Sequence, residues 1–308
     1  MAPAGVPLRF VSNSEALFAP YVARLMGRPG SMPDTRIAAL VTPGLPTWAD
    51  ETLPPARFHQ ILAERGLHAA YPFRPGIWQL YDPGRRLGAL LVDAPSVLPP
   101  WDSGAPLRQH LHWLLASHGR RIMHAAGLGE GGRGVLFVGN SGAGKSGMAL
   151  AGLAVGLTTV GDDYLGIGEE AGEVVARPLY RIIKQDRFGI SRVPQLAVEA
   201  DRFPLNWKGK VELDPESHFP GCFAERLGIA AVVIPHIAHA ATPNLAEAGR
   251  GEALRALMRS NLHQYPGETD DGMAFYAAIL RRLPVFTLSL SADFPANGEL
   301  VRRLIRSL

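Results

Sequence analysis

Four residues of this chain, Gly139, Gly144, Lys145 and Ser146, have the spacing G-x-x-x-x-G-K-[ST], which is typical of loops that bind nucleotide phosphates. Glycines let such a loop wrap closely, and its N–H groups point at phosphate oxygens with help from the following helix dipole. We expect Lys145 to reach the β- and γ-phosphates and the Ser146 hydroxyl to bind Mg²⁺. The residues predicted to bind the nucleotide are Gly139, Asn140, Ser141, Gly142, Ala143, Gly144, Lys145, Ser146 and Gly147.

The residues on either side of this motif agree with it. Residues 135–138 form a continuous apolar run that predicts a buried strand, and residues 148–153 predict the opening of a helix. A Gly/Ser-rich turn that matches the motif by chance is the alternative, but a strand before and a helix after favour a phosphate loop. The sequence therefore predicts that the protein binds ATP or another nucleoside triphosphate.

Two adjacent acids, Asp162 and Asp163, follow residues 157–160, a β-branched run that predicts a strand. Ligands of open α/β sheets lie at the carboxyl ends of strands. Phosphoryl transfer needs a cation clamp, a metal and an acid that orients the incoming hydroxyl. We therefore expect the two acids to end a strand adjoining that of the phosphate loop and to face the loop across Mg²⁺. A helix cap or a solvated turn is the alternative.

A histidine precedes the motif in a position that brings it close to the same site. Residues 121–128 predict a short strand that contains His124, and the glycine-rich residues 129–132 predict a turn back into the phosphate-loop strand. The two strands would then be adjacent, which would place His124 near the nucleotide end of the sheet. A histidine whose hydrogen bonds are satisfied within the strand is the alternative.

The composition places the chain among ordinary globular proteins. Its 308 residues are 47% hydrophobic and 19% charged, and a net charge of +3 with a pI near 9.2 is only mildly basic. Without a run of Lys and Arg, we expect no nucleic-acid partner. A single cysteine, Cys222, suits a reducing compartment. Residues 1–10 do not resemble a signal peptide and apolar runs such as 229–234 are short, so we expect no membrane partner and a cytoplasmic location.

Residues 1–105 differ from the rest of the chain and predict a separate, smaller α/β or β-rich domain of unknown role. Residues 77–81 and 87–92 predict a hairpin around the turn Asp82-Pro83-Gly84, and a helix is expected from Glu15. A boundary near residues 99–106, rich in proline, leaves residues 106–308 as the catalytic domain. Its later helices are expected at 251–261, 270–282 and 298–308, and its later strands at 229–235 and 285–290.

Together, His124, the run GVLFVGNSGAGKS and the run TTVGDD resemble the catalytic domain of the bacterial HPr serine kinase/phosphorylase family. They also resemble HPr-kinase-like proteins encoded beside peptide-modification genes, including those for lasso peptides. The resemblance covers residues 107–167 best, and it implies an α/β fold related to phosphoenolpyruvate carboxykinases. It also implies an ATP- and Mg²⁺-dependent serine kinase, with Asp163 as the base, Asp162 on the metal in that or the reverse order, and His124 near the transferred phosphate.

The chain departs from that family in one motif. The family's Glu-Ile-Arg-Gly-Leu-Gly segment is absent, and residues 184–189 stand in its place, so phosphorylase activity and HPr as the substrate are not expected. Lys184 and Arg187 in this segment, or Lys208 and Lys210 in the turn predicted at 206–215, could contact phosphate. The alternative for each is a solvated surface charge.

The predicted function is phosphoryl transfer from ATP to a hydroxyl. A serine of a small protein or of a precursor peptide is the favoured acceptor, and a small-molecule alcohol is the alternative among enzymes. A nucleotide-binding regulator without transfer activity is the alternative from another class. The sequence does not separate these acceptors, and it leaves the oligomeric state open, including a homo-oligomer.

Overall fold

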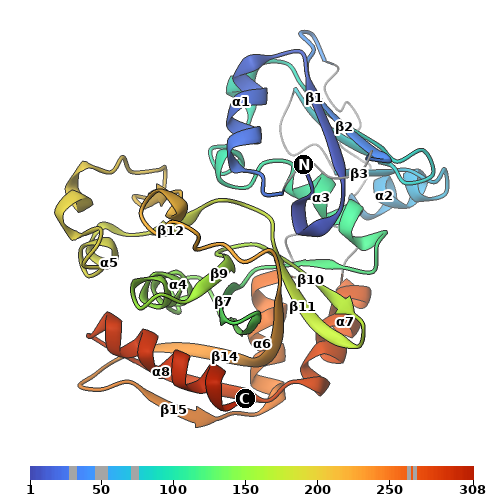
Figure 1. Ribbon diagram of the computed structural model, residues 1–308. Coiled ribbons are helices and arrows are strands. Elements are labelled where there is room, and N and C mark those ends of the chain that lie inside the picture. Colours follow the sequence, from blue (N-terminus) through green and yellow to red (C-terminus); the bar gives the residue numbers. More distant parts are fainter. Residues whose placement is uncertain (28–32, 46–54, 71–75, 262–264, 266–268) are drawn as a thin grey trace. The chain divides into compact units, whose positions relative to one another are not determined.

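The structure is a computed structural model that describes residues 1–27, 33–45, 55–70, 76–261, 265 and 269–308 (Figure 1). Contacts divide the chain into two compact units: Met1–Arg120 with Tyr265–Gly267, and Arg121–Gln264 with Glu268–Leu308. The sequence predicted a boundary near residue 105 instead. The helix α3 (Arg108–Ala116) belongs to the first unit because it packs on the strand β4, and its His110 Nε2 lies 3.0 Å from the carbonyl oxygen of Ala89.

Within the described residues, the first unit contains a five-stranded sheet in the order β1-β2-β5-β4-β3. Its strands are β1 (Leu8–Ser12), β2 (Thr35–Val41), β3 (His68–Ala70), β4 (Ile77–Asp82) and β5 (Leu87–Val92), and its helices besides α3 are α1 (Glu15–Arg24) and α2 (Pro55–Ala63). Short 3₁₀ turns lie at Pro3–Gly5, Pro95–Val97 and Asp102–Gly104. The predicted hairpin is confirmed, since β4 and β5 pair antiparallel. The aromatic rings of Tyr81 and Trp113 stack 6.3 Å apart and fix α3 on the sheet.

The second unit contains, among the described residues, a nine-stranded sheet whose main path is β6-β10-β11-β14-β8-β7-β9. The strands on this path are β6 (Arg121–Met123), β7 (Ala126–Glu130), β8 (Arg133–Phe137), β9 (Thr158–Gly161), β10 (Leu165–Glu170), β11 (Glu173–Pro178) and β14 (Leu227–Ala240). The strand β16 (Val285–Ser291) pairs parallel with β14, and β15 (Asn244–Glu247) pairs with β16. The long β14 lies between β8 and β16, which run parallel to it.

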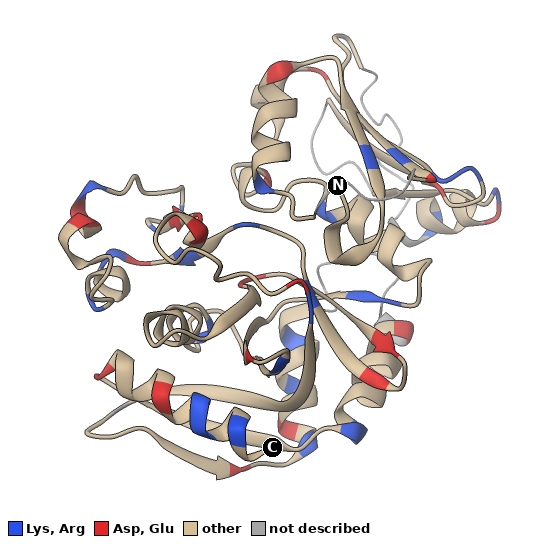
Figure 2. Cartoon of the chain, in the orientation of Figure 1, with Lys and Arg blue, Asp and Glu red and all other residues tan. Residues whose placement is uncertain are grey.

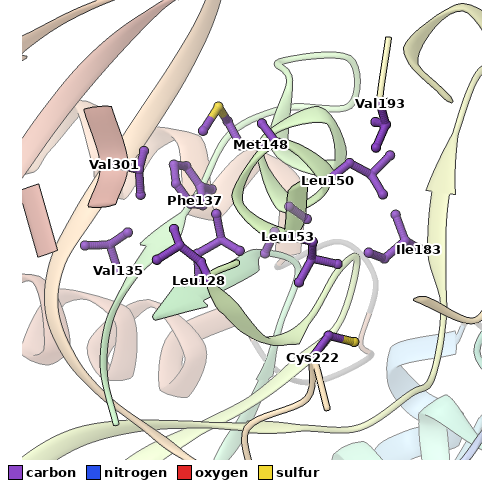
Figure 3. Packing of buried hydrophobic residues seen from close by; sticks show 14 of the residues in the cluster. Leu128, Val135, Phe137, Met148, Leu150, Leu153, Ile183, Val193, Cys222 and Val301 are labelled. Atoms are coloured by element: carbon purple, nitrogen blue, oxygen red, sulfur yellow. The ribbon is translucent and has the colours of Figure 1, made fainter. Parts of the chain in front are cut away.

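The apolar runs of β8 and β14 arise because helices cover both faces of the sheet. Val135 and Phe137 pack in one core with the helices α4 (Lys145–Ala154) and α8 (Phe294–Ser307). The alternate residues Leu136 and Val138 pack in another core with α6 (Arg250–Asn261) and α7 (Thr269–Arg282). A strand buried on both sides has no polar face, which is why its sequence is apolar throughout. Figure 3 shows the first core, where side chains of β7 and β8 meet those of α4 and Val301 of α8.

Two expectations about strands were wrong in detail. The strand predicted at 121–128 is broken into β6 and β7, and His124 lies between them rather than in a strand. The acids do not end a strand adjoining β8, because β7 lies between β8 and β9. Since β8 and β9 both run antiparallel to β7, they run in the same direction. Their carboxyl ends therefore still meet at one edge of the sheet.

The remaining chain forms an excursion beside α4, comprising β12 (Ile183–Gln185), α5 (Arg187–Ser191) and β13 (Val211–Leu213), with 3₁₀ turns at Ala197–Arg202 and Pro215–Ser217. Ile183 and Val193 of this excursion enter the core beneath α4 (Figure 3). Lys, Arg, Asp and Glu are interspersed along the described chain (Figure 2), as in the ion pairs of Glu130 with Arg302 and Arg306. None of the described helices is both long and apolar enough to span a membrane.

Candidate phosphate-transfer site

The loop between β8 and α4 has a backbone that two glycines make accessible. Gly142 and Gly144 have φ values of +84° and +107°, a region that side chains with a Cβ avoid. Gly144 is also the residue before the first turn of α4, and a Cβ there would lie 2.5 Å from Cδ1 of Leu290. The glycine at position 144 is therefore required both by the backbone angle and by the close approach of β16.

Lys145 is held inward over this loop. Its side chain is only 6% exposed, and Nζ donates hydrogen bonds to the carbonyl oxygens of Gly139 at 2.8 Å and Asn140 at 3.2 Å. Burial lowers the pKa of Lys145, while the charges of Asp162 and Asp163 act in the opposite direction. The loop thus carries a buried cation next to two acids, as a clamp for anionic phosphate requires.

Asp162 is a buried acid with one oxygen left over. It is 1% exposed, the Lys184 N–H donates to Oδ2 at 3.3 Å, and the nearby Ser146 side chain acts to lower its pKa. Oδ1 is buried without a hydrogen-bond partner among the described residues. Burial raises the pKa of Asp162, and the charge of Asp163 raises it further. A buried charge is normally compensated by a hydrogen bond or an opposite charge, and this oxygen has no hydrogen-bond donor among the described residues.

Asp163 is paired with two basic side chains. Its Oδ1 lies 3.0 Å from His124 Nε2, and its Oδ2 accepts a hydrogen bond from Lys184 Nζ at 3.0 Å. Burial alone would raise the pKa of Asp163, but the hydrogen bond from His124 and the charge of Lys184 outweigh it and hold the pKa below its ordinary value. The residue has φ +72°, a left-handed conformation that aspartate tolerates better than most residues. Asp163 is therefore ionised and oriented.

His124 reaches this site from the break between β6 and β7. Its backbone N–H donates to Oδ1 of Asn261 at 2.6 Å, which anchors the break to α6. Its ring lies beside that of Tyr164, with centroids 5.6 Å apart. The sequence predicted His124 near the nucleotide end of the sheet, and in the structure its Nε2 lies 3.0 Å from Oδ1 of Asp163. Lys184 was named only as a residue that could contact phosphate, and in the structure it contacts Asp163 instead.

A cavity of about 560 Å³ opens beside these groups, a volume within the usual range for small-molecule sites. Of the predicted residues it is lined by Ser141, Gly142, Gly144, Lys145, Ser146, Gly147, His124, Asp162 and Asp163. Gly139 and Asn140 contribute through their carbonyl bonds to Lys145, and no such contact places Ala143 in the site.

The other cations named from the sequence lie in different environments. Lys210 lines the cavity. Arg187 instead donates to the carbonyl oxygen of Phe203 at 3.0 Å, and Lys208 lies 4.7 Å from the ring centre of Trp207. Sequence reasoning missed several further lining residues: Gln185, Asp186, Phe188, Arg192, Phe294 and Asn297. The only available signal for the first three was their position in residues 184–189, the segment that stands in place of the family's Glu-Ile-Arg-Gly-Leu-Gly motif.

The oxygens of Asp162 and Ser146 fit a magnesium ion. Mg²⁺ in phosphate sites is usually held by one or two carboxylates together with substrate phosphates and water. The orphaned Oδ1 of Asp162 and the adjacent Ser146 hydroxyl supply oxygen ligands of that kind. Across the described ranges, the chain has no cluster of three or more His, Cys, Asp or Glu side chains that would hold a metal by itself.

Comparison with known proteins adds little to this geometry. No protein-family model matches the chain, and no curated protein sequence matches it. One solved structure that resembles it is that of the Hpr(Ser) kinase/phosphatase from Coxiella burnetii. That protein is 14% identical, and the likeness has a TM-score of 0.34 and covers 61% of this chain and 97% of that chain. Such a likeness assigns no role to any residue.

Proposed function

We propose that this protein is an ATP- and Mg²⁺-dependent phosphotransferase that phosphorylates a hydroxyl group, with a serine of a small protein or peptide as the acceptor. The observation that carries the proposal is the meeting of four groups at one cavity. These are the buried cation Lys145, the Ser146–Asp162 pair, and the acid Asp163. A phosphate clamp, oxygen ligands and an oriented acid are the parts that phosphoryl transfer uses.

The roles follow from the surroundings of each group. Lys145 and the loop N–H groups bind the phosphates of the donor. Asp162 Oδ1 and the Ser146 hydroxyl hold Mg²⁺, which neutralises charge on the phosphates when it is bound. Asp163 accepts a hydrogen bond from the acceptor hydroxyl and orients it, while Lys184 and His124 fix the carboxylate.

The lowered pKa of Asp163 bears on its role as the base. A carboxylate with a lowered pKa is a weak proton acceptor. In a loose transition state, however, the bond to the incoming oxygen forms late, so orientation matters more than early removal of the proton. Asp163 then receives the proton only after the hydroxyl oxygen has begun to bond to phosphorus.

Two variants test the proposal. Binding is measured by calorimetry with Mg²⁺ and a non-hydrolysable ATP analogue, and transfer is measured with γ-labelled ATP and a library of serine-containing peptides. Lys145→Ala should weaken binding at least tenfold and abolish transfer. Asp163→Asn should leave binding within about threefold but lower transfer about 10²- to 10⁴-fold, the range for loss of a general base.

Lys208→Ala is the matched control, since it removes a lysine charge that lies on Trp207 and not in the cavity. Wild-type binding and transfer are expected from it. If Lys145→Ala bound the analogue like the wild type, the phosphate loop would have no part in the function. Binding that depends on Lys145 without labelling of any peptide or alcohol would identify a nucleotide-binding regulator instead.

A further inference from the structure

A second group of cavity residues combines aromatic rings with a cation. Phe188, Arg192 and Phe294 all line the cavity. The guanidinium carbon of Arg192 lies 5.4 Å from the ring centre of Phe188 and 4.5 Å from that of Phe294. Phe188 is 72% exposed, although a ring of this size is normally buried. We call these three residues the aromatic–arginine cluster.

The cluster lies next to the first turn of α4. Gly147 of that turn has no side chain, and a Cβ there would lie 3.6 Å from Cζ of Phe294 and 3.2 Å from Nε2 of Gln185. Gln185 precedes α5, whose Phe188 belongs to the cluster. Figure 1 shows α5 on one side of α4 and β9, which leads to the acids, on the other. A nucleotide held by the loop would therefore lie in the cavity that both the acids and the aromatic–arginine cluster line.

Arg192 has an unused donor. Its Nη2 is buried without a hydrogen-bond partner among the residues that the structure describes, and an unmet buried donor is costly. The two rings engage the guanidinium by cation–π contacts. A planar ligand with an acceptor atom on its edge would stack on the exposed ring of Phe188 and accept a hydrogen bond from Nη2. Phosphate offers no face for stacking, and every nucleobase does.

We infer that the aromatic–arginine cluster binds the base of the nucleotide, which makes it the part of the site that distinguishes a nucleotide from a bare polyphosphate. The inference rests on the proposed function, because the phosphate loop must hold the other end of the same ligand. The base stacks on Phe188, and Arg192 Nη2 donates to an acceptor nitrogen or oxygen on the base edge.

The test compares two ligands that share phosphates and differ in the base. Calorimetry with Mg²⁺ gives the Kd of the non-hydrolysable ATP analogue and that of inorganic tripolyphosphate. The wild type should bind the analogue more tightly. Phe188→Ala should weaken binding of the analogue about 5- to 100-fold, as expected for one base–aromatic stack, and leave tripolyphosphate within about twofold. Arg192→Lys keeps the charge but loses the planar fork, and it should cause the same selective loss.

Arg202→Ala is the matched control, because it removes an exposed arginine at the end of the 3₁₀ turn that follows α5 in the same excursion. Both Kd values should stay as in the wild type. Equal affinity of the wild type for both ligands would overturn the inference, as would a loss in Phe188→Ala that is the same for both. Failure of the proposed function looks different, since the wild type would then bind neither ligand.

A fluorescence measurement tests the same inference without relying on Kd values. Phe188→Trp places an indole at the exposed position, where a stacked purine should quench its fluorescence. Adding the analogue should lower the tryptophan emission of Phe188→Trp more than that of the wild type. Adding tripolyphosphate should cause no such extra decrease. An equal response to both ligands would place the base elsewhere.

Discussion

Alanine at two glycines of the phosphate loop should destabilise the protein to different extents, because the glycines have similar backbone angles but different surroundings. Gly142 and Gly144 have φ values of +84° and +107°, so alanine at either position is strained by about 1–2 kcal/mol. At Gly142 an added Cβ would meet nothing within 4 Å. At Gly144 it would lie 2.5 Å from Cδ1 of Leu290 and would displace that side chain, which costs about 1–3 kcal/mol more.

We therefore expect Gly142→Ala to lower the free energy of unfolding by about 1–2 kcal/mol and Gly144→Ala by about 2–5 kcal/mol. Urea denaturation followed by tryptophan fluorescence, without nucleotide, measures both values. Gly144→Ala should also weaken binding of the ATP analogue more than Gly142→Ala does, because the Leu290 side chain that it displaces lines the cavity.

Comparing Leu290→Ala with the double variant Leu290→Ala/Gly144→Ala isolates the contact with Leu290. In a Leu290→Ala background the colliding methyl group is gone, so Gly144→Ala should cost only the backbone strain, about 1–2 kcal/mol. Substitutions at two residues in contact are expected to have non-additive effects on the free energy of unfolding. The reasoning is refuted if Gly144→Ala costs no more than Gly142→Ala in the wild type, or if its extra cost persists when Leu290 is absent.

Two further predictions concern buried titratable groups. Asp162→Asn keeps the shape of the side chain but removes its buried negative charge, so without metal it should raise the free energy of unfolding at neutral pH by about 1–3 kcal/mol. Mg²⁺ should stabilise the wild type in thermal denaturation and not the variant, and equal stabilisation of both would remove Asp162 from the metal site. Burial lowers the pKa of His110 to about 4 from 6.5, so its neutral form stabilises the protein above pH 6.5 and that stability is lost as the pH falls toward 4. The loss at pH 5 is about 2 kcal/mol relative to pH 7.5, and the burial of His59 and His68, which also lowers their pKa, acts in the same direction. Urea denaturation at pH 5 and pH 7.5 measures this loss of unfolding free energy, which should be smaller in His110→Gln than in the wild type. An equal loss in both proteins would exclude His110 as its source.

Local patterns predicted the elements around the phosphate loop well. The strand β8, the helix α4 and the strand β9 lie where an apolar run, a helical run and a β-branched run placed them. The hairpin of β4 and β5 follows from its Asp-Pro-Gly turn in the same way. Each of these signals depends on neighbours in sequence, which is why it can be detected without the fold.

Pairings between distant segments were predicted less well. The strand β7 lies between β8 and β9 because it pairs with both of them, and the pairing with β9 joins segments that are not neighbours in sequence. The break at His124 depends on Asn261, which lies in a helix far along the chain and binds the His124 N–H. No local pattern near residue 124 records that contact.

The sequence by itself determined the phosphate-loop motif, the acid pair and the helices and strands that flank them, because spacing and periodicity act over a few residues. Only the tertiary structure decided that Lys184 and His124 pair with Asp163, that Asp162 Oδ1 finds no hydrogen-bond partner among the described residues, and that Phe188, Arg192 and Phe294 share the cavity. Those relations join residues from separate elements through burial and charge, and burial exists only once the sheet and its helices have packed.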